Sequence, residues 1–342
     1  MKYSSICTET ELETFMTTPS ASLVKAVRKW EGDIIGLGAS GKMGIELMRL
    51  LQNADLINGK KRKYYAASTF SAPETIARLE AVGIKTFKGD LSDSGFLKKL
   101  PEVKNVFYMA GFKFGSSGSY QKAYHMNIIM PYLNGERFKA SKITCFSTCN
   151  FYPHLERKTG GAKETTPVAP QGIYGWTALG RENAFNIISE KYDTKVALYR
   201  LAYAQHLHYG VLIDIAKMVK TQDKIHLTNN YVNLISQRDA NEVAIKSMNL
   251  VSSPPAVINC AGPIADVTEI IKIMAKQMGK KIKVIKNKTN EAMISNDDLA
   301  VKTMGAYRDK PLDMIKAAAA WVEKGGKSWN KPTGFLNIDH KY

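Results

Sequence analysis

The feature that most constrains this chain is a glycine-rich turn, DIIGLGASGKMG at residues 33–44, between a short apolar run and a helical pattern. The apolar run is typical of a buried strand, and apolar residues recur at helical spacing after the turn. Gly38 permits a tight turn, Gly41 lets the backbone approach a pyrophosphate, and Gly44 lets the helix pack close to the strand. The helix N-terminus then offers N–H groups and a positive dipole end to the phosphates. The turn predicts a dinucleotide site, and the alternative is a plain tight turn between a strand and a helix.

Strands and helices alternate along the chain from residue 33 to residue 201. After the first strand, further strands are predicted at 63–69, 84–87, 103–109, 143–148 and 196–201. Helices are predicted over 73–82, 119–140 and 174–192, the second of them bent near Pro131. This alternation is typical of a parallel sheet whose strands are joined by right-handed crossovers.

The pattern loosens after residue 201. Short strands at 224–227, 232–236, 257–260 and 281–285 mix there with helices over 240–250, 267–278 and 312–323. We expect an α/β fold, a doubly wound parallel sheet of the Rossmann type with a smaller C-terminal α/β lobe for the substrate. The expected division is a helical extension at 1–32, a dinucleotide-binding domain at 33–203 and the substrate lobe at 204–342, interleaved with that domain and without a flexible linker. Thr8 and Glu11 form a predicted capping box in the extension, which should pack on the outside of the nucleotide domain.

The charge balance is strongly basic, with 48 lysines and arginines against 31 acidic residues and a formal net charge of +17. One interpretation is steering of an anionic ligand, such as a dinucleotide or a phosphorylated substrate. The other is general lysine usage on a solvated surface. The basic runs are not interleaved with stacking aromatic residues, so we expect no nucleic-acid partner.

Other sequence features exclude further classes of protein. No run of eighteen apolar residues appears, so no membrane span is expected, and the N-terminus has no apolar signal segment. The four cysteines lack metal-ligand spacing and indicate reduced thiols in a cytoplasmic protein. His206 and His208 are interpreted as a loop pair near the mouth of the site, and no metal is expected because no carboxylate or cysteine flanks them.

The glycine turn is followed by five short motifs in order along the chain. They are Gly89-Asp90-Leu91, Met109-Ala110-Gly111, Ser147 to Tyr152, Tyr174 to Ala178, and Leu198 to Leu201. In this order, over roughly residues 33–325, the chain resembles the extended short-chain dehydrogenase/reductase family, the NAD-dependent epimerase/dehydratase group. The resemblance implies a nicotinamide dinucleotide as cofactor, a sugar or sugar nucleotide as substrate, and a homodimer formed through the long helices.

The resemblance also implies which residues hold the cofactor. The backbone of 40–43 would hold the pyrophosphate, Asp90 would accept a hydrogen bond from the adenine amino group with Leu91 beside the ring, and the chain after the fourth strand would lie along the cofactor. The full set is Gly38, Ser40, Gly41, Lys42, Met43, Gly44, Thr69, Asp90, Leu91, Ala110 and Gly111.

Two residues match the catalytic positions of the family. Tyr174 would move the proton at the substrate oxygen, and Thr148 would orient that oxygen by a hydrogen bond. Lys113, Asn127 and Ser147 are candidate substrate residues. For Lys113, contact with an anionic group of the substrate and a place on the surface remain equal alternatives.

The chain departs from the family pattern at one position. The family reads Tyr-x-x-x-Lys, and Ala178 stands where the lysine belongs. That lysine would hold the nicotinamide ribose and favour the phenolate of the tyrosine. Arg181 is the candidate replacement, since it lies one turn further on the same helix face and side chains lean towards the helix N-terminus. The alternative is that Arg181 pairs with Glu182 or Glu190, or faces solvent.

The end of the second strand bears on the choice of cofactor. NAD-binding proteins usually place an acidic residue there to bind the ribose hydroxyls, and residues 67–70 contain none. This favours NADP slightly over NAD. The sequence as a whole predicts an NAD(P)-dependent oxidoreductase, epimerase or dehydratase with Tyr174, Thr148 and Arg181 as catalytic residues and an anionic small molecule as substrate. The alternative is a catalytically degenerate sensor or scaffold that binds a dinucleotide.

Overall fold

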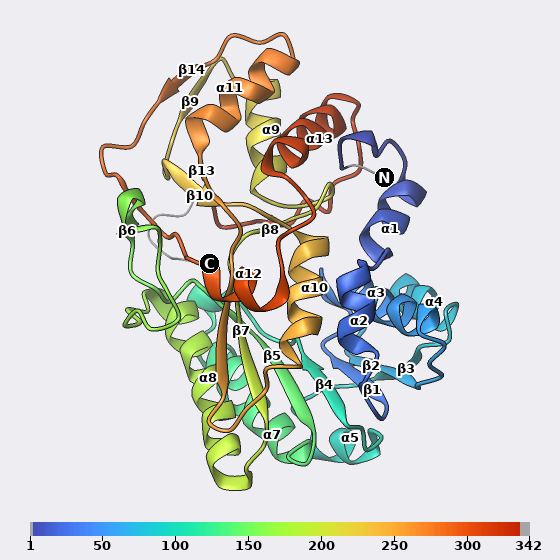
Figure 1. Ribbon diagram of the computed structural model, residues 1–342. Helices are drawn as coiled ribbons and strands as arrows, with labels where there is room; N and C mark the ends of the chain where they lie inside the picture. Colours follow the sequence, from blue (N-terminus) through green and yellow to red (C-terminus); the bar gives the residue numbers. More distant parts are fainter. Residues whose placement is uncertain (1–2, 336–342) are drawn as a thin grey trace.

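The computed structural model describes residues 3–335 of the chain. Its centre is a seven-stranded parallel sheet with the strand order β12-β7-β5-β4-β1-β2-β3 (Figure 1). The strands are β1 (Ile34–Leu37), β2 (Tyr64–Ser68), β3 (Lys85–Lys88), β4 (Asn105–Tyr108), β5 (Lys142–Thr148), β7 (Val196–Leu201) and β12 (Ala256–Cys260). Because β1 lies between β2 and β4, the strand order reverses there, as in doubly wound α/β folds. The predicted fold class is confirmed.

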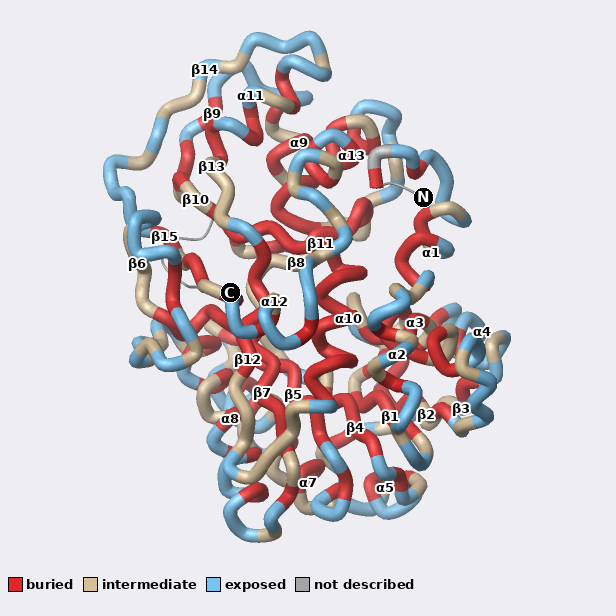
Figure 2. The backbone as a smooth tube through the Cα atoms, viewed as in Figure 1, coloured by how far each residue is buried: buried red, intermediate tan, exposed pale blue. Residues whose placement is uncertain are grey.

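Helices cover both faces of the sheet, and neighbouring residues of each strand point to opposite faces. Ile34 shares an apolar core with α2 (Ala21–Val27), α3 (Gly44–Ile57) and α10 (Gln237–Ser247). Ile35 shares the core of the other face with α5 (Ser94–Lys99), α7 (Met130–Arg137) and α8 (Gly172–Tyr192). Figure 2 shows the strands and the inner sides of these helices as buried. Burial on both faces explains why the inner strands, such as β1 and β4, are largely apolar, whereas the edge strand β3 is exposed at both ends.

The strand at 256–260 belongs to the main sheet and not to the second lobe. β12 pairs in parallel with β7, Val257 opposite Leu198 and Ile258 opposite Tyr199. The prediction that placed 257–260 among the short strands of the lobe is therefore wrong. An apolar pattern reports that a strand is buried, but it does not report which sheet the strand joins.

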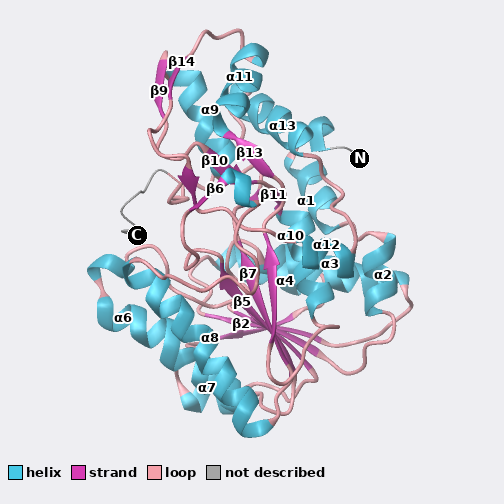
Figure 3. Cartoon of the chain, turned by 60° about the vertical axis from the view of Figure 1, so that its left-hand side comes forward, coloured by secondary structure: helices cyan, strands magenta, loops and turns pink. Residues whose placement is uncertain are grey.

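The helix predicted over 119–140 is divided into three segments. They are α6 (Tyr120–Tyr124), the π-helical turn η3 (His125–Ile129) and α7. The backbone stays helical through all three segments, and Pro131 lies just after the π-helical turn, so its missing N–H leaves a carbonyl of that turn without a helical hydrogen bond. Figure 3 shows α6, α7 and α8 together on one side of the molecule.

The second lobe is built on three helices around its own apolar core, α9 (Val211–Thr221), α11 (Val267–Gln277) and α13 (Pro311–Glu323). Four two-stranded sheets complete the chain: β9 (Lys224–His226) with β14 (Lys283–Ile285), β10 (Tyr231–Asn233) with β13 (Ile264–Asp266), β8 (Ala204–Gln205) with β11 (Ile235–Ser236), and β6 (Leu155–Glu156) with β15 (Glu291–Ala292). The remaining short elements are α4 (Pro73–Glu80), α12 (Asp298–Met304), η1 (Tyr3–Ser5), η2 (Ser116–Gly118) and η4 (Arg157–Thr159). Within residues 3–335 no helix is both long and apolar enough to cross a bilayer.

The N-terminal extension connects the lobe with the nucleotide-binding part. Thr8 and Glu11 form the predicted capping box at the start of α1 (Glu9–Thr17). Phe15 of this helix is part of the core of the second lobe, while Glu13 forms an ion pair with Arg49 of α3. The extension therefore lies between the two parts of the molecule as well as on the outside of the nucleotide-binding part.

Candidate active site

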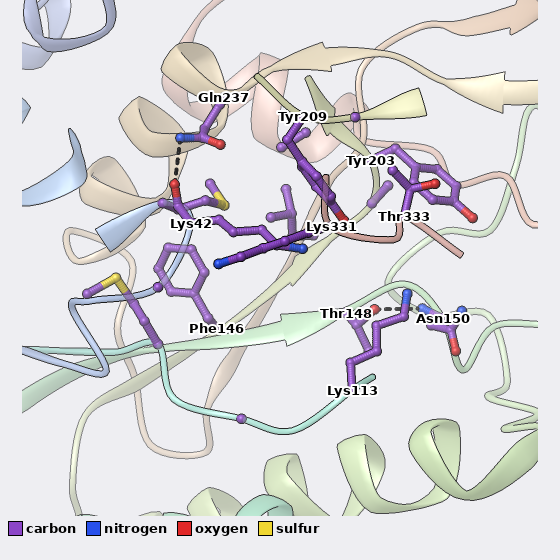
Figure 4. Close-up of a pocket in the computed structure, with 18 of the residues that line it drawn as sticks. Lys42, Lys113, Phe146, Thr148, Asn150, Tyr203, Tyr209, Gln237, Lys331 and Thr333 are labelled. Carbon is purple, nitrogen blue, oxygen red and sulfur yellow. Dashed lines mark hydrogen bonds between the residues drawn. The ribbon is translucent and has the colours of Figure 1, made fainter. Parts of the chain in front are cut away.

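A cavity of about 520 Å³ lies at the carboxyl ends of the central strands (Figure 4). Its walls are formed mainly by residues at and directly after the ends of β1, β4, β5 and β7, and by 203–204 and 209–211 of the second lobe. It is also lined by Gln237, Met293, Lys331 and Thr333. Ligands of doubly wound sheets bind outside the carboxyl ends of the strands, at the point where the strand order reverses. The cavity is therefore the candidate active site.

The glycine turn forms one wall of this cavity and has the close approaches that its spacing predicts. Gly38 has a φ of +82°, and a Cβ there would lie 2.7 Å from the backbone nitrogen of Ala110. A Cβ on Gly44 would lie 2.4 Å from the carbonyl oxygen of Ala39, so α3 could not pack as closely with any other residue. A Cβ on Gly41 would meet only the carbonyl oxygen of Gly38, at 3.3 Å. The backbone here leaves a cradle beside the N-terminus of α3 that a pyrophosphate fits.

Three lysines line the cavity, one from each of three separate segments. Lys42 comes from the glycine turn, Lys113 from the loop after β4, and Lys331 from the C-terminal segment (Figure 4). Burial, reinforced by the charge of Lys331, lowers the pKa of Lys42 to about 8. Burial, reinforced by the charge of Lys42, lowers the pKa of Lys113 to about 7. Among the described residues no carboxylate lines this cavity, so its chemistry suits an anionic ligand.

The C-terminal segment 326–335, which we call the strap, supplies Lys331 to the cavity. Trp329 of the strap stacks on the ring of His206, with 4.8 Å between the ring centroids. The hydroxyl of Tyr209 donates a hydrogen bond to the carbonyl oxygen of Pro332 at 2.9 Å. These contacts place Lys331 near Lys42, although 289 positions separate the two residues in the sequence.

Thr148 faces the cavity and Ser147 does not. Thr148, the last residue of β5, lines the cavity, and its hydroxyl accepts a hydrogen bond from the backbone N–H of Asn150 at 3.0 Å. The hydroxyl of Ser147 points to the other face of the sheet and donates to Glu182 at 2.5 Å. Glu182 is in turn paired with Arg200 at 2.7 Å. The structure thus brings Thr148 to the site and commits Ser147 to a buried ion-pair network.

Tyr174 lies beside the cavity, in the first turn of α8. It is buried against Phe151 and Ala178 in a small apolar cluster. The ammonium nitrogen of Lys113 lies 5.2 Å from the centroid of the Tyr174 ring. Lys113, on the loop after β4, therefore places its positive charge beside Tyr174. Position 178, where the family pattern has a lysine, is a fully buried alanine.

Arg181 is buried and points toward the sheet. Its guanidinium donates to the carbonyl oxygen of Phe146 at 3.0 Å and to Oδ1 of Asn127 at 2.7 Å. A Cβ on Gly111 would lie 2.4 Å from its Nη2 atom, so Arg181 supports the loop after β4 from behind. The alternatives of a solvent-facing side chain or a pair with Glu182 are wrong. Because Arg181 does not line the cavity, its expected contact with a ribose or with Tyr174 has no support in the structure.

Asn127 holds the same loop and does not reach the cavity. Its side chain is 0 % exposed and forms two hydrogen bonds with the backbone of Phe112, as acceptor from N–H at 2.8 Å and as donor to the carbonyl at 2.7 Å. It also donates to the hydroxyl of Thr177 at 3.0 Å. Asn127 lies in the π-helical turn η3, and turns of this kind occur frequently at functional sites. It therefore positions the loop that carries Lys113 instead of contacting a substrate.

The residues expected to bind the adenosine half lie along the neighbouring strands. Asp90 follows β3 and accepts hydrogen bonds from the N–H and the hydroxyl of Ser92, both at 2.8 Å, which hold the pKa of its carboxyl below the usual range. Leu91 is buried in the core, and Thr69 is exposed. The contact of Asp90 with adenine stays a prediction, because its present partners are those of a turn.

The histidine pair lies in a second cavity, of about 660 Å³, on the other side of the glycine turn. Nε2 of His206 lies 3.1 Å from Glu46, and Nε2 of His208 lies 2.9 Å from Glu9. No group of three or more metal-ligating side chains is found in the described part of the chain. These histidines join the N-terminal extension to the loop that carries Tyr209.

Sequence reasoning missed the residues that the later part of the chain adds to the site, among them Tyr203, Tyr209, Gln237, Met293, Lys331 and Thr333. They come from distant segments without a shared motif. The one local signal was the unusual His206-x-His208 pair, because it directly precedes Tyr209.

Comparison with solved structures returns nucleotide-sugar epimerases. UDP-glucose 4-epimerase from Thermotoga maritima, solved with UDP-glucose, superposes with a TM-score of 0.69 at 16% identity over 86% of this chain and 99% of that chain. UDP-glucuronic acid 4-epimerase from Bacillus cereus, in complex with UDP-glucuronic acid and NAD, superposes with a TM-score of 0.68 at 17% identity over 85% of this chain and 99% of that chain. The chain has their fold. No protein-family model matches the sequence. No curated protein matches it either.

Proposed function

We propose that this protein is an NAD-dependent oxidoreductase that acts on a sugar nucleotide, with epimerisation as the reaction. The observation that carries the proposal is the cavity itself, where a glycine turn and the hydroxyl of Thr148 converge with the ammonium groups of Lys42, Lys113 and Lys331. The similarity in fold to epimerases solved with UDP-sugars supports the same class of substrate. The three lysines, on a described cavity wall that has no carboxylate, suit the negative charges of two diphosphates, one on the cofactor and one on the substrate.

The residues present fit a dinucleotide. The cradle at Gly38 and Gly44 would hold the pyrophosphate, and the chain at Ala110 and Gly111 would lie along the rest of the molecule. When bound, NAD supplies an acceptor for a hydride from a carbinol carbon. Thr148 would donate a hydrogen bond to the oxygen on that carbon and so fix its orientation.

We propose NAD over NADP. The B. cereus epimerase was solved with NAD, and the slight preference for NADP drawn from the missing acid has no such support. At the end of β2 the hydroxyls of Ser68 and Ser40 are 2.6 Å apart and bond to each other. Arg78 of α4 lines the second cavity together with Ser40, and its half-exposed side chain is paired with Glu13 at 2.9 Å.

Epimerisation is favoured over dehydration by the chemistry of the cavity wall. Elimination of water from a sugar needs one group to protonate the leaving hydroxyl and another to remove a proton from carbon. The cavity has no carboxylate among its described residues, and burial raises the pKa of Cys149 to about 12, so its thiol stays protonated. Transfer of a hydride away from a carbon and back to it needs only one proton-exchanging group.

We further propose a homodimer through the helices on one side of the molecule (Figure 3). Large apolar side chains are each about half exposed on the adjoining α6, η3 and α8: Tyr120, Tyr124, Ile129, Trp176 and Ile187. Large apolar side chains exposed on adjoining helices are typical of an interface, and a second copy of the chain fits them because the same helices would pack against themselves. Trp176→Glu should convert the dimer into a monomer in light scattering, and a monomeric wild-type protein contradicts the proposal.

A cytoplasmic location agrees with the four free cysteines.

The experiment that tests the proposed function is a titration followed by an epimerase assay. NAD, NADP and a panel of UDP-sugars are titrated by calorimetry, and conversion of each bound UDP-sugar to its epimer is followed by NMR. We expect NAD to bind, Gly41→Asp to abolish that binding by adding bulk and negative charge, and one UDP-sugar to be converted. The apolar surroundings of position 178 favour one competing function, a dinucleotide sensor without catalysis, which would bind NAD but convert none of the sugars. Absence of NAD binding contradicts both.

A further inference from the structure

We propose that Lys113 is the proton-exchanging residue of this site, in place of the tyrosine–lysine pair that Ala178 interrupts. The inference rests on the proposed function, since it names the group that exchanges the proton of the substrate hydroxyl. It assigns to Lys113 a role that the family pattern gives to another segment of the chain.

The position of Lys113 is the first argument. Lys113 and Thr148 both line the cavity, whereas Tyr174 lies behind Lys113 and is not among the lining residues. Figure 4 shows the Lys113 side chain rising from its loop toward Thr148 and Asn150. A substrate oxygen held by Thr148 would therefore have the Lys113 ammonium group beside it, which is the geometry that proton exchange requires.

The rigidity of the loop is the second argument. Phe112, which directly precedes Lys113, has both its N–H and its carbonyl bonded to the buried side chain of Asn127. Arg181 braces the same loop from behind at Gly111. Two buried polar side chains thus hold the backbone on which Lys113 stands, as a catalytic group needs.

The surroundings of Lys113 are the third argument. The groups that face it include the ammonium of Lys42, the ring of Phe114 at 5.5 Å and the ring of Tyr174 at 5.2 Å. Lys331 adds its charge next to Lys42, and Asp214, which does not line the cavity, offsets part of the charge at Lys42. No carboxylate lines the described cavity wall. This environment disfavours the ammonium form and lowers the pKa of Lys113 to about 7, so both the amine and the ammonium are present at neutral pH.

Arg181 cannot take the same role. A guanidinium does not lose its proton in proteins, and this one is bonded to Phe146 and Asn127. Lys113 is therefore the cation beside Tyr174 that is able to exchange a proton in the physiological range.

The step balances with NAD as the oxidant. The Lys113 amine takes the hydroxyl proton of the substrate and becomes an ammonium, while the carbinol hydrogen leaves with its electron pair as a hydride to NAD and a carbonyl forms. In the return step the hydride adds to the opposite face of that carbonyl. The Lys113 ammonium then gives the proton back to the oxygen, so the enzyme and the cofactor return to their starting state.

The first test needs neither cofactor nor substrate. The protein is labelled with [ε-¹³C]lysine, and the lysine resonances are followed by NMR from pH 5 to pH 11. We expect one resonance to titrate near pH 7, to be missing from Lys113→Met, and to persist in Lys122→Met. Lys122 is the matched control because its ammonium also lies over an aromatic ring, that of Phe112 at 5.0 Å, but on an exposed helix outside the cavity. A spectrum in which no lysine titrates below pH 9 overturns the proposal.

The second test separates proton exchange from charge. Lys113→Arg keeps the positive charge but cannot release a proton, so kcat should fall about 10²- to 10⁴-fold while NAD affinity stays within about threefold. Tyr174→Phe should lose less than about tenfold, and Lys122→Met should lose nothing. Full turnover by Lys113→Arg, or a larger loss in Tyr174→Phe than in Lys113→Arg, overturns the role of Lys113 alone. A wild-type protein that binds no NAD contradicts the proposed function, whatever the lysine spectrum is.

Discussion

Replacement of Asn127 by alanine should destabilise the protein and loosen its active-site loop at once. The side chain is 0 % exposed and forms four hydrogen bonds: two with the backbone of Phe112, one with the hydroxyl of Thr177 and one with the guanidinium of Arg181. Asn127→Ala leaves each of these partners buried without the bond. The loss is therefore the cost of unsatisfied groups and not merely of a removed side chain.

The size of the loss follows from the partners. Each of the three neutral hydrogen bonds contributes about 1 kcal/mol to the free energy of unfolding, and the bond to the charged Arg181 contributes about 1.5–3 kcal/mol. Together these give an expected loss of about 5 kcal/mol in Asn127→Ala. That is a large part of the total of about 5–15 kcal/mol typical of a folded domain, so the variant should remain folded only marginally.

Urea unfolding measures the loss, and a second asparagine of the same helical segment provides the control. Asn134 lies two turns further on, is 1 % exposed, and donates to the carbonyls of Leu91 and Met130 at 2.8 and 2.7 Å. Asn134→Ala should therefore lose about 2 kcal/mol and bind NAD normally, whereas Asn127→Ala should also bind it more weakly. Equal losses in the two variants, or a loss below about 2 kcal/mol in Asn127→Ala, would refute the reasoning about the loop.

Substitutions at Gly44, Asp90 and Lys113 test the glycine turn, the adenine contact and the buried lysine. Gly44→Ala places a Cβ 2.4 Å from the carbonyl oxygen of Ala39, so we expect a loss of about 3 kcal/mol in thermal unfolding and weaker NAD binding in calorimetry; unchanged melting would show that α3 can move away. Asp90→Ala should weaken NAD by about 1–3 kcal/mol if the carboxylate binds adenine, whereas normal affinity with a lower melting temperature would indicate only its turn with Ser92. The folded pKa of Lys113 is about 7 and its ordinary value is 10.5, so the lysine costs stability fully below pH 7 and not at all above pH 10.5. Lys113→Met should therefore raise the free energy of unfolding most at low pH, and a difference that does not shrink from pH 7 to pH 10 contradicts this linkage.

The sequence predicts the parts of the fold that depend on local pattern. Six of the seven strands of the main sheet lie where the sequence predicts a strand of that sheet, and the glycine spacing predicts the close contacts at Gly38 and Gly44. The alternation of strands and helices then leaves the doubly wound sheet as the natural arrangement. Thr148 was expected from the family resemblance, and it lines the cavity because it ends a buried strand at the edge of the sheet where ligands bind.

Features that depend on contacts between distant segments are not predictable from local pattern. The pairing of β12 with β7 is invisible in the apolar run of 256–260, which looks the same in any sheet. The π-helical turn changes which face of the helix Asn127 occupies, and a regular helical spacing cannot reveal this. Arg181 was expected near Tyr174 from helix geometry, but it points to the sheet because Asn127 and the carbonyl of Phe146 provide buried acceptors there.

The strap makes the affinity of this site depend on a folding equilibrium. Thr333 donates a hydrogen bond to Asp214 at 2.6 Å, and Trp329 donates its backbone N–H to His208 at 2.9 Å, so Lys331 reaches the cavity only while these contacts hold. For any ligand that needs Lys331, the observed dissociation constant equals the intrinsic one divided by the fraction of molecules whose strap is docked. By the same relation, such a ligand increases the docked fraction when it binds. A substitution at Trp329, which does not line the cavity, would thus change the affinity without contact to the ligand, through the population of the docked conformation.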